Sequence, residues 1–299
     1  MDYLIPNLTS DSIPKKTAVI NDLTGFGRCS LAVVLPIVSA MKVQACPVPT
    51  SVFSNHMGFP SYYHKDLSDT LSPYLGVYNT MEICFDGIYC GFLSSPAQFN
   101  SVFEFIKSQR LLAVSQNKIP PVILIDPVMG DLGKPYKIVT NPLRLKMKRL
   151  VHDATILTPN LTESCMLTDT VYPVSEPSGG FLREITEKLL QMGPSKVAVT
   201  GISKGNRVYN YCAEMRDGKP YFFTYETPCN GESRPGTGDI FASVLMADAL
   251  NGVEFETSVQ KAADFILTCV NASSRAGVPV KEGVIFENYL SALFTPRRV

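Results

Sequence analysis

Short apolar runs alternate with segments of helical periodicity along nearly the whole chain. A short apolar run bounded by polar residues is typical of a buried strand, whereas apolar residues at positions i, i+3, i+4 and i+7 are typical of a helix that buries one face. Strands are predicted at residues 17–20, 43–48, 87–93, 122–125, 155–157 and 196–200.

Helical spacing is clear in Leu31–Met41, Phe99–Ile106 and Leu182–Met192, and Gly193 is the predicted C-terminal cap of the third helix. Another helix is predicted to begin at the glycine-rich loop before Ile240 and to end at Gly252. Residues 207–227 instead predict two strands around Asp217-Gly218, a dipeptide that favours a tight hairpin turn. The alternation predicts an α/β fold: a mostly parallel central sheet with helices on both faces.

The composition limits the classes of function. Of the 299 residues, 45% are hydrophobic, and 27 basic residues balance 27 acidic ones. A neutral chain argues against nucleic-acid binding through a general basic surface, although one local site can still hold an anion. The apolar content excludes a disordered chain. With no repeat or linker, we expect residues 1–16 to form a loosely attached extension and residues 17–299 to form a single domain.

No targeting signal is evident in this sequence. The first residues lack a basic region followed by an apolar stretch, and no segment approaches the roughly 18 apolar residues of a membrane span. Eight scattered cysteines without a CxxC pair are typical of reduced core residues. We therefore expect a cytoplasmic protein without a membrane or nucleic-acid partner.

Polar residues follow directly after several of the predicted strands. They are Asn21-Asp22, Ser54-Asn55-His56, Asp126, Thr158-Pro159-Asn160 and Thr200. Each alone is explained by a turn or a helix cap. In an open α/β sheet, however, ligands bind beyond the carboxyl ends of the strands, so their joint occurrence predicts a binding site at that edge.

A glycine loop, RPGTGD at residues 234–239, precedes the helix that ends at Gly252. Gly236 and Gly238 allow the backbone to approach an anion closely, and the amides of the first helical turn can donate to it. The loop is neither a Walker P-loop nor a GxGxxG fingerprint. Taken alone, Asp239 is explained either as a plain N-cap or as a functional acid.

Five motifs decide between these interpretations: VFSNH at 52–56, CGFLSS at 90–95, DPVMGD at 126–131, TPNLTE at 158–163 and GTGD at 236–239. In this order they resemble the ribokinase-like superfamily, and within it the pyridoxal/pyridoxamine kinase branch, over residues 18–287. The resemblance implies a three-layer ribokinase-like sandwich. It also implies an enzyme that uses ATP to phosphorylate the 5′-hydroxymethyl group of pyridoxamine, pyridoxal or pyridoxine.

The resemblance also implies roles for individual residues. Asp239 is the base that takes the proton of the hydroxymethyl group, while the backbone of Gly236, Thr237 and Gly238 receives the charge on the transferred phosphate. ATP is expected at Asp126, Thr158, Asn160, Glu163 and Thr200, with a monovalent cation, for which K⁺ is the candidate, near Thr158 and Thr200. Mg²⁺ is expected at Asp126, Asp131 and Glu163, in part through water. Asp126 also fits a turn before proline, and Glu163 a helix-capping acid.

The substrate residues implied by the resemblance are Asp22, Phe53, Asn55, His56, Met57 and Tyr136. Tyr136 belongs to a loop, residues 130–137, that is expected to close over the substrate. Asp22 and Met57 stand where relatives typically have serine and threonine. Asp22 is interpreted either as a partner for a donor on the substrate or as a residue that caps the next helix or pairs with Arg28, and His56 either contacts the ring or is a packed histidine.

Two other functions stay open at this point. A kinase for hydroxymethylpyrimidine or another small alcohol would use the same fold, and a non-catalytic vitamer-binding protein would retain it without turnover. Asp239, the two loop glycines and Glu163 together favour catalysis, because a binding protein does not require all of them. Relatives are commonly homodimers, so the resemblance implies a homodimer.

Overall fold

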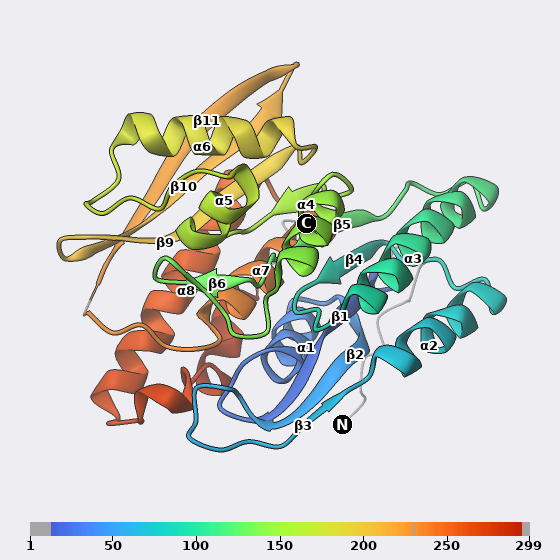
Figure 1. The fold of residues 1–299 in the computed structure, drawn as a ribbon, viewed down its shortest axis with the longest axis horizontal. Helices are drawn as coiled ribbons and strands as arrows, with labels where there is room; N and C mark the ends of the chain where they lie inside the picture. The colour runs from blue at the N-terminus through green and yellow to red at the C-terminus, as the bar shows by residue number, and fades with distance from the viewer. Residues whose placement is uncertain (1–12, 230, 295–299) are drawn as a thin grey trace, which may run out of the picture.

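The computed structural model describes residues 13–229 and 231–294, whose strands form a nine-stranded sheet (Figure 1). The strands are β1 (Lys16–Phe26), β2 (Gln44–Asn55), β3 (His64–Asp66), β4 (Gly87–Cys90), β5 (Val122–Ile125), β8 (Ile156–Leu157), β9 (Lys196–Lys204), β10 (Arg207–Arg216) and β11 (Lys219–Pro228). Their order across the sheet is β11-β10-β9-β8-β5-β4-β1-β2-β3. The six strands from β9 to β2 run parallel, and β3, β10 and β11 pair antiparallel at the edges.

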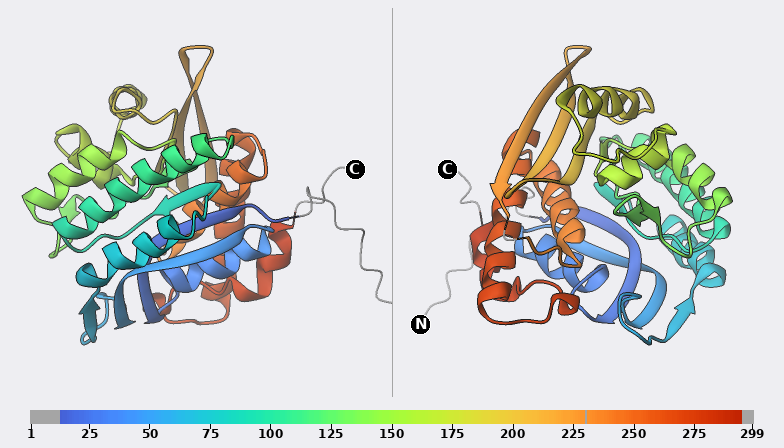
Figure 2. Two further views of the ribbon diagram at one scale, coloured as in Figure 1. Left: turned by 90° about the vertical axis from the view of Figure 1, so that its right-hand side faces the viewer. Right: turned by 60° about the vertical axis from the view of Figure 1, so that its left-hand side comes forward.

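Helices cover both faces of this sheet (Figure 2). On one face lie α1 (Leu31–Ala40), α7 (Thr237–Leu250) and α8 (Phe255–Arg275), followed by the 3₁₀ turns η2 (Val280–Glu282) and η3 (Glu287–Leu293). On the other face lie α2 (Ser68–Thr80), α3 (Pro96–Ser115), α4 (Asn141–Val151), α5 (Leu161–Thr168) and α6 (Gly179–Gln191). The predicted three-layer α/β fold with a mostly parallel sheet is therefore confirmed.

Alternate residues of the central strands fill two separate cores. Ala18 and Ile20 of β1 pack toward α2–α6, whereas Val19 between them packs toward α1, α7 and α8. All three side chains are fully buried. Burial on both faces is the reason that these strands appear in the sequence as continuous apolar runs rather than as an alternating pattern.

The first two strands extend beyond their predicted ends. β1 continues to Phe26 and β2 to Asn55, and the two stay paired along this length, with a register shift between Asn21 and Leu23. Asp22 therefore lies inside β1 at this irregularity rather than after the strand. Bulges of this kind reorient single side chains, often beside functional sites.

The predicted hairpin is present as β10 and β11, which extend beyond the helical layers in Figure 2. Asp217 and Gly218 form its turn with φ values of 48° and 76°, and a two-residue turn with both φ values positive matches the twist of the strands. The capping glycines Gly193 and Gly252 both have positive φ directly after the cap residues of α6 and α7.

The predicted N-terminal extension is described only from residue 13 onward. Residues 1–12 of the predicted extension lie outside the described residues. Within the described part, Lys15 and Lys16 already belong to the sheet, because the Lys15 carbonyl accepts the Gln44 amide and Lys16 begins β1. None of the helices in residues 13–229 and 231–294 is long and apolar enough to cross a membrane.

Candidate active site

The carboxyl ends of the central strands lie side by side at one edge of the sheet. The Gly91 amide after β4 donates to Ile20 of β1, the Asp126 amide after β5 donates to Cys90 of β4, and the Thr158 amide after β8 donates to Ile125 of β5. These backbone bonds of 2.8, 2.9 and 3.1 Å place Asp126 and Thr158 at the edge where ligands bind in such sheets.

The glycine loop begins α7, and its glycines have different functions. Gly236 is the N-cap, with a left-handed φ of 84°, and a Cβ at this position would lie 2.1 Å from the carbonyl oxygen of Arg28. Gly238 lies inside the first helical turn, where a Cβ would meet nothing within 4 Å. The interpretation of Asp239 as the N-cap is therefore wrong, because Asp239 is the third helical residue. The left-handed backbone and the close Arg28 carbonyl require glycine at position 236, whereas Gly238 keeps the space above the first-turn amides open.

Two donors hold the carboxylate of Asp239. The Asn21 side-chain amide donates to Oδ1 at 3.2 Å and the Ser30 backbone amide donates to Oδ2 at 2.8 Å. Burial and the nearby Asp22 carboxylate raise the pKa of Asp239 to about 7. A carboxyl whose pKa lies near neutrality is suited to accept a proton from an alcohol.

Glu163 links the start of α5 to the loop after β5. Its carboxylate accepts the Asn160 amide at 2.8 Å and the Met129 amide at 3.1 Å, while the Asn160 side chain accepts the Glu163 amide at 2.9 Å. The reciprocal bonds are the predicted capping box. Burial raises the pKa of Glu163 to about 8, against the opposing effect of these amides.

Asp126 lies close enough to Glu163 and Asp239 to interact electrostatically with both carboxylates. Burial raises the pKa of Asp126 well above its ordinary value, and Glu163 and Asp239 raise it further. Asp131 is exposed and its Oδ1 accepts the Leu132 amide, but its charge still raises the pKa of Glu163. Three acids at one buried edge cannot all ionise without a compensating positive charge.

Within the described residues, no three histidine, cysteine or acidic side chains form a ready-made metal site. The acids nevertheless fit Mg²⁺, which takes few protein carboxylates and keeps waters and phosphate oxygens as its other ligands. The buried Thr158 hydroxyl has no hydrogen-bond partner among the described residues, which fits a position that awaits a ligand.

The raised pKa values of Asp239 and Glu163 determine whether the free energy of unfolding rises or falls with pH. In the unfolded chain these acids ionise near their ordinary values of about 4, whereas in the folded protein Asp239 holds its proton to about pH 7 and Glu163 to about pH 8. Between these limits the folded state binds more protons than the unfolded state. The free energy of unfolding is therefore expected to fall as the pH rises from about 4 to about 8.

Asp126→Asn tests this electrostatic cost. In buffer without nucleotide or Mg²⁺, we expect it to raise the free energy of unfolding by about 0.5–2 kcal/mol near pH 8, and to change it less near pH 5, because the cost of burying or protonating the Asp126 carboxylate falls with the pH. Thermal melts at both pH values measure the difference. The exposed Glu104→Gln in α3 is the matched control, and an equal change at both pH values for Asp126→Asn would contradict the argument.

The remaining nucleotide candidates lie together at the end of β8 and in the middle of β9, which continues past its predicted end at Thr200 to Lys204. The Thr200 amide donates to the Pro159 carbonyl at 2.9 Å, and the Asn160 side chain donates to the Gly130 carbonyl at 2.8 Å. These bonds fix the middle of β9 and the DPVMGD motif to the residues before α5. Thr158, Asn160, Glu163 and Thr200 are thus brought to one place.

The loop at residues 130–137 contains a short hairpin, β6 (Gly130–Asp131) and β7 (Lys134–Pro135). The Gly133 amide donates to the Thr162 hydroxyl at 2.8 Å, and the Tyr136 amide donates to the Met129 carbonyl at 2.9 Å. The Tyr136 side chain is 38% exposed. Closure of this loop over a substrate stays a prediction.

The candidate substrate residues of β2 lie beside the extended end of β1. Phe53 is buried and stacks on His64 with ring centroids 4.3 Å apart. The Asn55 side chain donates to the Ser61 carbonyl, and the Met57 side chain is partly exposed. Phe53 also lies near the rings of Tyr62 and Phe92, with centroids 6.0 and 6.2 Å away, so aromatic side chains form a wall at this end of β2.

Both ring nitrogens of His56 are engaged by backbone atoms. Nδ1 accepts the Gly58 amide at 3.1 Å, so Nε2 carries the proton and donates to the Lys281 carbonyl at 2.7 Å. In this structure His56 fastens the β2–β3 loop to the segment around η2. Of the two sequence-based interpretations, this geometry favours a packed histidine over a ring contact.

Asp22 is buried, and both of its oxygens accept hydrogen bonds from hydroxyl groups. Ser30 donates to Oδ1 and Thr24 donates to Oδ2, each at 2.7 Å. Arg28 pairs instead with Glu287 at 2.7 Å, so the suggested Asp22–Arg28 pair is wrong. A donor on a substrate would have to compete with these two hydroxyls for Asp22.

Arg234 is a structural residue of the site that the sequence analysis did not single out. Its buried guanidinium donates to the Val278 and Gly283 carbonyls at 3.0 and 3.1 Å and pairs with Glu232. The Arg234 carbonyl accepts the Thr237 hydroxyl. The signal in the sequence was an arginine directly before the glycine loop, but the two carbonyls that it binds lie more than 40 positions away.

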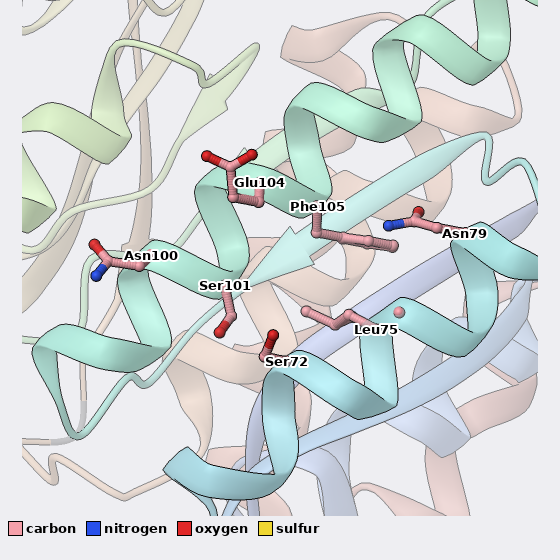
Figure 3. Close-up of a pocket in the computed structure, with 8 residues that line it drawn as sticks. Ser72, Leu75, Asn79, Asn100, Ser101, Glu104 and Phe105 are labelled. Atoms are coloured by element: carbon pink, nitrogen blue, oxygen red, sulfur yellow. The ribbon is translucent and has the colours of Figure 1, made fainter.

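A groove of about 280 Å³ lies elsewhere, between α2 and α3 (Figure 3). Its lining includes Ser72, Asn79, Ser101 and Glu104, and none of the candidate site residues. The candidate site is therefore defined by the sheet edge and the start of α7 rather than by this groove.

Comparison with known proteins assigns this chain to a family. A sequence model of the phosphomethylpyrimidine kinase family matches residues 39–283. The chain belongs to this kinase family. Family, fold and enzyme class agree with the resemblance seen in the motifs, that of a kinase related to the pyridoxal kinases of the ribokinase-like superfamily.

Individual relatives support this assignment. The structure of a candidate phosphomethylpyrimidine kinase from Bacteroides thetaiotaomicron, solved with pyridoxal, is 33% identical with a TM-score of 0.87 and covers 96% of this chain and 98% of that chain. A pyridoxal kinase of Arabidopsis thaliana is 27% identical over 77% of this chain and 71% of that protein. A candidate pyridoxal kinase of Schizosaccharomyces pombe is 29% identical. That match covers 67% of this chain and only 57% of the length of that protein.

Proposed function

We propose that this kinase transfers the γ-phosphate of ATP to the 5′-hydroxymethyl group of pyridoxal, pyridoxamine or pyridoxine. The observation that carries the proposal is the position of Asp239: a half-buried carboxylate with a pKa of about 7, in the first turn of a helix whose N-cap has no side chain. A proton acceptor and a phosphate-binding helix terminus thus lie within one turn of each other.

The chemistry follows from these positions. The alcohol oxygen of the substrate attacks the γ-phosphorus, the bond from that phosphorus to the ADP oxygen breaks so that ADP leaves, and Asp239 accepts the proton of the alcohol. The amides of Gly238 and Asp239 at the start of α7 receive the negative charge that develops on the transferred group. Asp126 and Glu163 would hold Mg²⁺ through its waters, and bound Mg²⁺ would neutralise charge on the phosphates. We assign a monovalent cation, with K⁺ as the candidate, to the region of Thr158 and Thr200.

The vitamer is assigned to the space between Asp239 and the aromatic wall of β2. Phe53, Asn55 and Met57 would border the ring on one side, and Tyr136 would cover it from the loop after β5. The pyridoxal-bound Bacteroides relative supports a pyridine substrate. The second candidate, hydroxymethylpyrimidine, is supported by the family description and needs the same base and phosphate site.

A parallel substrate panel tests the proposal. ATP consumption is measured with pyridoxal, pyridoxamine, pyridoxine and hydroxymethylpyrimidine, and each phosphorylated product is identified by mass. We expect turnover of at least one B6 vitamer at a higher kcat/KM than hydroxymethylpyrimidine. Turnover of hydroxymethylpyrimidine alone would reject the vitamer assignment, and vitamer binding without ADP release would identify a binding protein.

A cytoplasmic location and a homodimer remain predictions from the sequence and its resemblance. Light scattering of the purified chain, at concentrations used for kinetics, distinguishes a dimer from a monomer. A monomer with full activity would contradict the predicted assembly without affecting the catalytic assignment.

A further inference from the structure

The side chain of Asn21 is locked between β1, β4 and α7. It is 1% exposed. Its oxygen accepts the backbone amides of Asp22 at 3.0 Å and of Phe92 at 2.9 Å, and its nitrogen donates to Asp239 at 3.2 Å. Because both partners of the oxygen are donors, the amide cannot be flipped, and the NH₂ group has to face Asp239.

The neighbouring backbone restrains Asn21 further. A Cβ at Gly91 would lie 2.8 Å from the Asn21 side chain, so the amide has no free space on that side. The strand irregularity between Asn21 and Leu23 directs consecutive polar side chains toward the site. The orientation of the amide is therefore fixed before any ligand binds.

The second oxygen of Asp239 is held with similar rigidity. Its donor, the Ser30 amide, belongs to a turn in which Gly27, Arg28 and Ser30 have φ values of 111°, 41° and 56°. Left-handed conformations are unfavourable for arginine and serine, and such strain is typically retained at functional sites. The Ser30 hydroxyl is bonded to Asp22 in addition.

We propose that Asn21 is a positioning residue that orients the carboxylate of Asp239 for proton transfer, together with the strained turn at Ser30. The inference rests on the proposed role of Asp239 as the base. Because each oxygen is held by a fixed donor, the carboxylate cannot rotate freely, and each oxygen keeps a lone pair with which it can accept the substrate proton. Hydrogen bonds from Asn21 and Ser30 also favour the ionised carboxylate that accepts the proton.

Asn21→Asp tests the inference with little change in shape. An aspartate can still accept the Asp22 and Phe92 amides, but when ionised it cannot donate to Asp239, and it places a second carboxylate beside it. The two acids are expected to share a proton to higher pH. We expect the acidic limb of the kcat/KM profile to move upward by about one pH unit or more, and kcat near neutral pH to fall at least about tenfold with partial recovery at higher pH.

Gln109→Glu is the matched control. Gln109 of α3 is another fully buried amide, whose oxygen accepts the Phe85 amide and whose nitrogen donates to the Ile83 carbonyl, both at 3.0 Å. The substitution introduces a buried acid far from Asp239. It is expected to lower the melting temperature without moving the acidic limb.

A double variant controls for destabilisation of the fold by an additional buried carboxylate. Asn21→Asp combined with Asp22→Asn keeps the number of buried carboxylates constant, and it should still show an upward shift, smaller than that of Asn21→Asp because the Asp22 charge that also raises the pKa of Asp239 is lost. Carbon-13 NMR titration of the Asp239 carboxyl in substrate-free protein reports the shift independently of turnover. An unmoved acidic limb and an unmoved NMR titration in a folded variant would overturn the inference.

Asp239→Asn in the same series separates this inference from the proposed function. If Asp239→Asn retains activity, the proposed base is wrong. If Asp239→Asn is inactive while Asn21→Asp keeps the wild-type profile, only the positioning role of Asn21 is wrong.

Discussion

Replacing Asp239 with asparagine is expected to lower kcat by about 10²–10⁴-fold, the range typical for loss of a general base. The amide can still accept one of the two hydrogen bonds that Asn21 and Ser30 donate, so the start of α7 should keep its structure. Removing a buried charge with a raised pKa should offset the loss of the other bond at neutral pH. The measurement is kcat with the best vitamer of the panel, alongside a thermal melt.

The pH profile gives this prediction a second readout. In the wild type, Asp239 has to be ionised to accept a proton, so kcat/KM should fall about tenfold per pH unit below its pKa, which is about 7. The acidic limb should disappear in Asp239→Asn. A variant with near-wild-type kcat and an unchanged limb would show that another group is the base.

Asp248→Asn is the matched control for Asp239→Asn. Asp248 is a buried aspartate of the same helix, but it pairs with Lys261 of α8 at 2.7 Å, away from the sheet edge. Breaking a buried pair by removing one partner is destabilising. We expect a lower melting temperature and an unchanged pH profile, the reverse of the result for Asp239.

The hydrophobic pattern predicted the central strands best because they are buried on both faces. β5 was predicted to the residue, and α1 was predicted even though Pro36 lies inside it. The pattern failed where buried side chains are polar. Asn21, Asp22 and Thr24 are almost fully buried in β1, but their polarity ended the predicted strand too early.

Other helices were missed because their apolar stripes are narrow or interrupted. α8 is the longest helix of the described residues, yet only Phe255, Val259 and Phe265 among its large side chains are well buried, between polar residues and alanines. α2 contains Pro73 and Gly76, which weaken any helical prediction. Packing against the sheet stabilises both helices, and a local pattern does not show that contact.

The motifs predicted that Asp126, Glu163 and Asp239 come close together, but they could not predict how these side chains are held. Asn21 and Asp239 are 218 positions apart, and His56 and Lys281 are 225 apart. Sequence spacing carries no information about such bonds. His56 therefore appeared as a ring contact or a packed residue with equal justification, and only the fold shows that both nitrogens are occupied by backbone atoms.

Gly236→Ala is expected to damage both the fold of the loop and the activity. Its Cβ would lie 2.1 Å from the Arg28 carbonyl oxygen, and its φ of 84° is unfavourable for any residue with a side chain. The left-handed conformation alone costs about 1–2 kcal/mol, and the clash adds about 1–3 kcal/mol. Arg28 cannot easily yield, because it pairs with Glu287 and its turn carries the Ser30 amide that holds Asp239.

Gly238→Ala, two residues further on, separates phosphate binding from loop structure. A Cβ at this position meets nothing within 4 Å, and alanine favours a helix over glycine by about 0.5–1 kcal/mol. The melting temperature should therefore stay equal or rise, whereas the methyl group would occupy the space above the first-turn amides and raise the KM for ATP. If Gly238→Ala used ATP with unchanged KM and kcat, the phosphate would have to bind elsewhere. If Gly236→Ala kept its melting temperature, the turn at Arg28 would be able to move away from the new methyl group. The Ser30 amide in that turn would then not be a rigid donor to Asp239, and only Asn21 would remain as one.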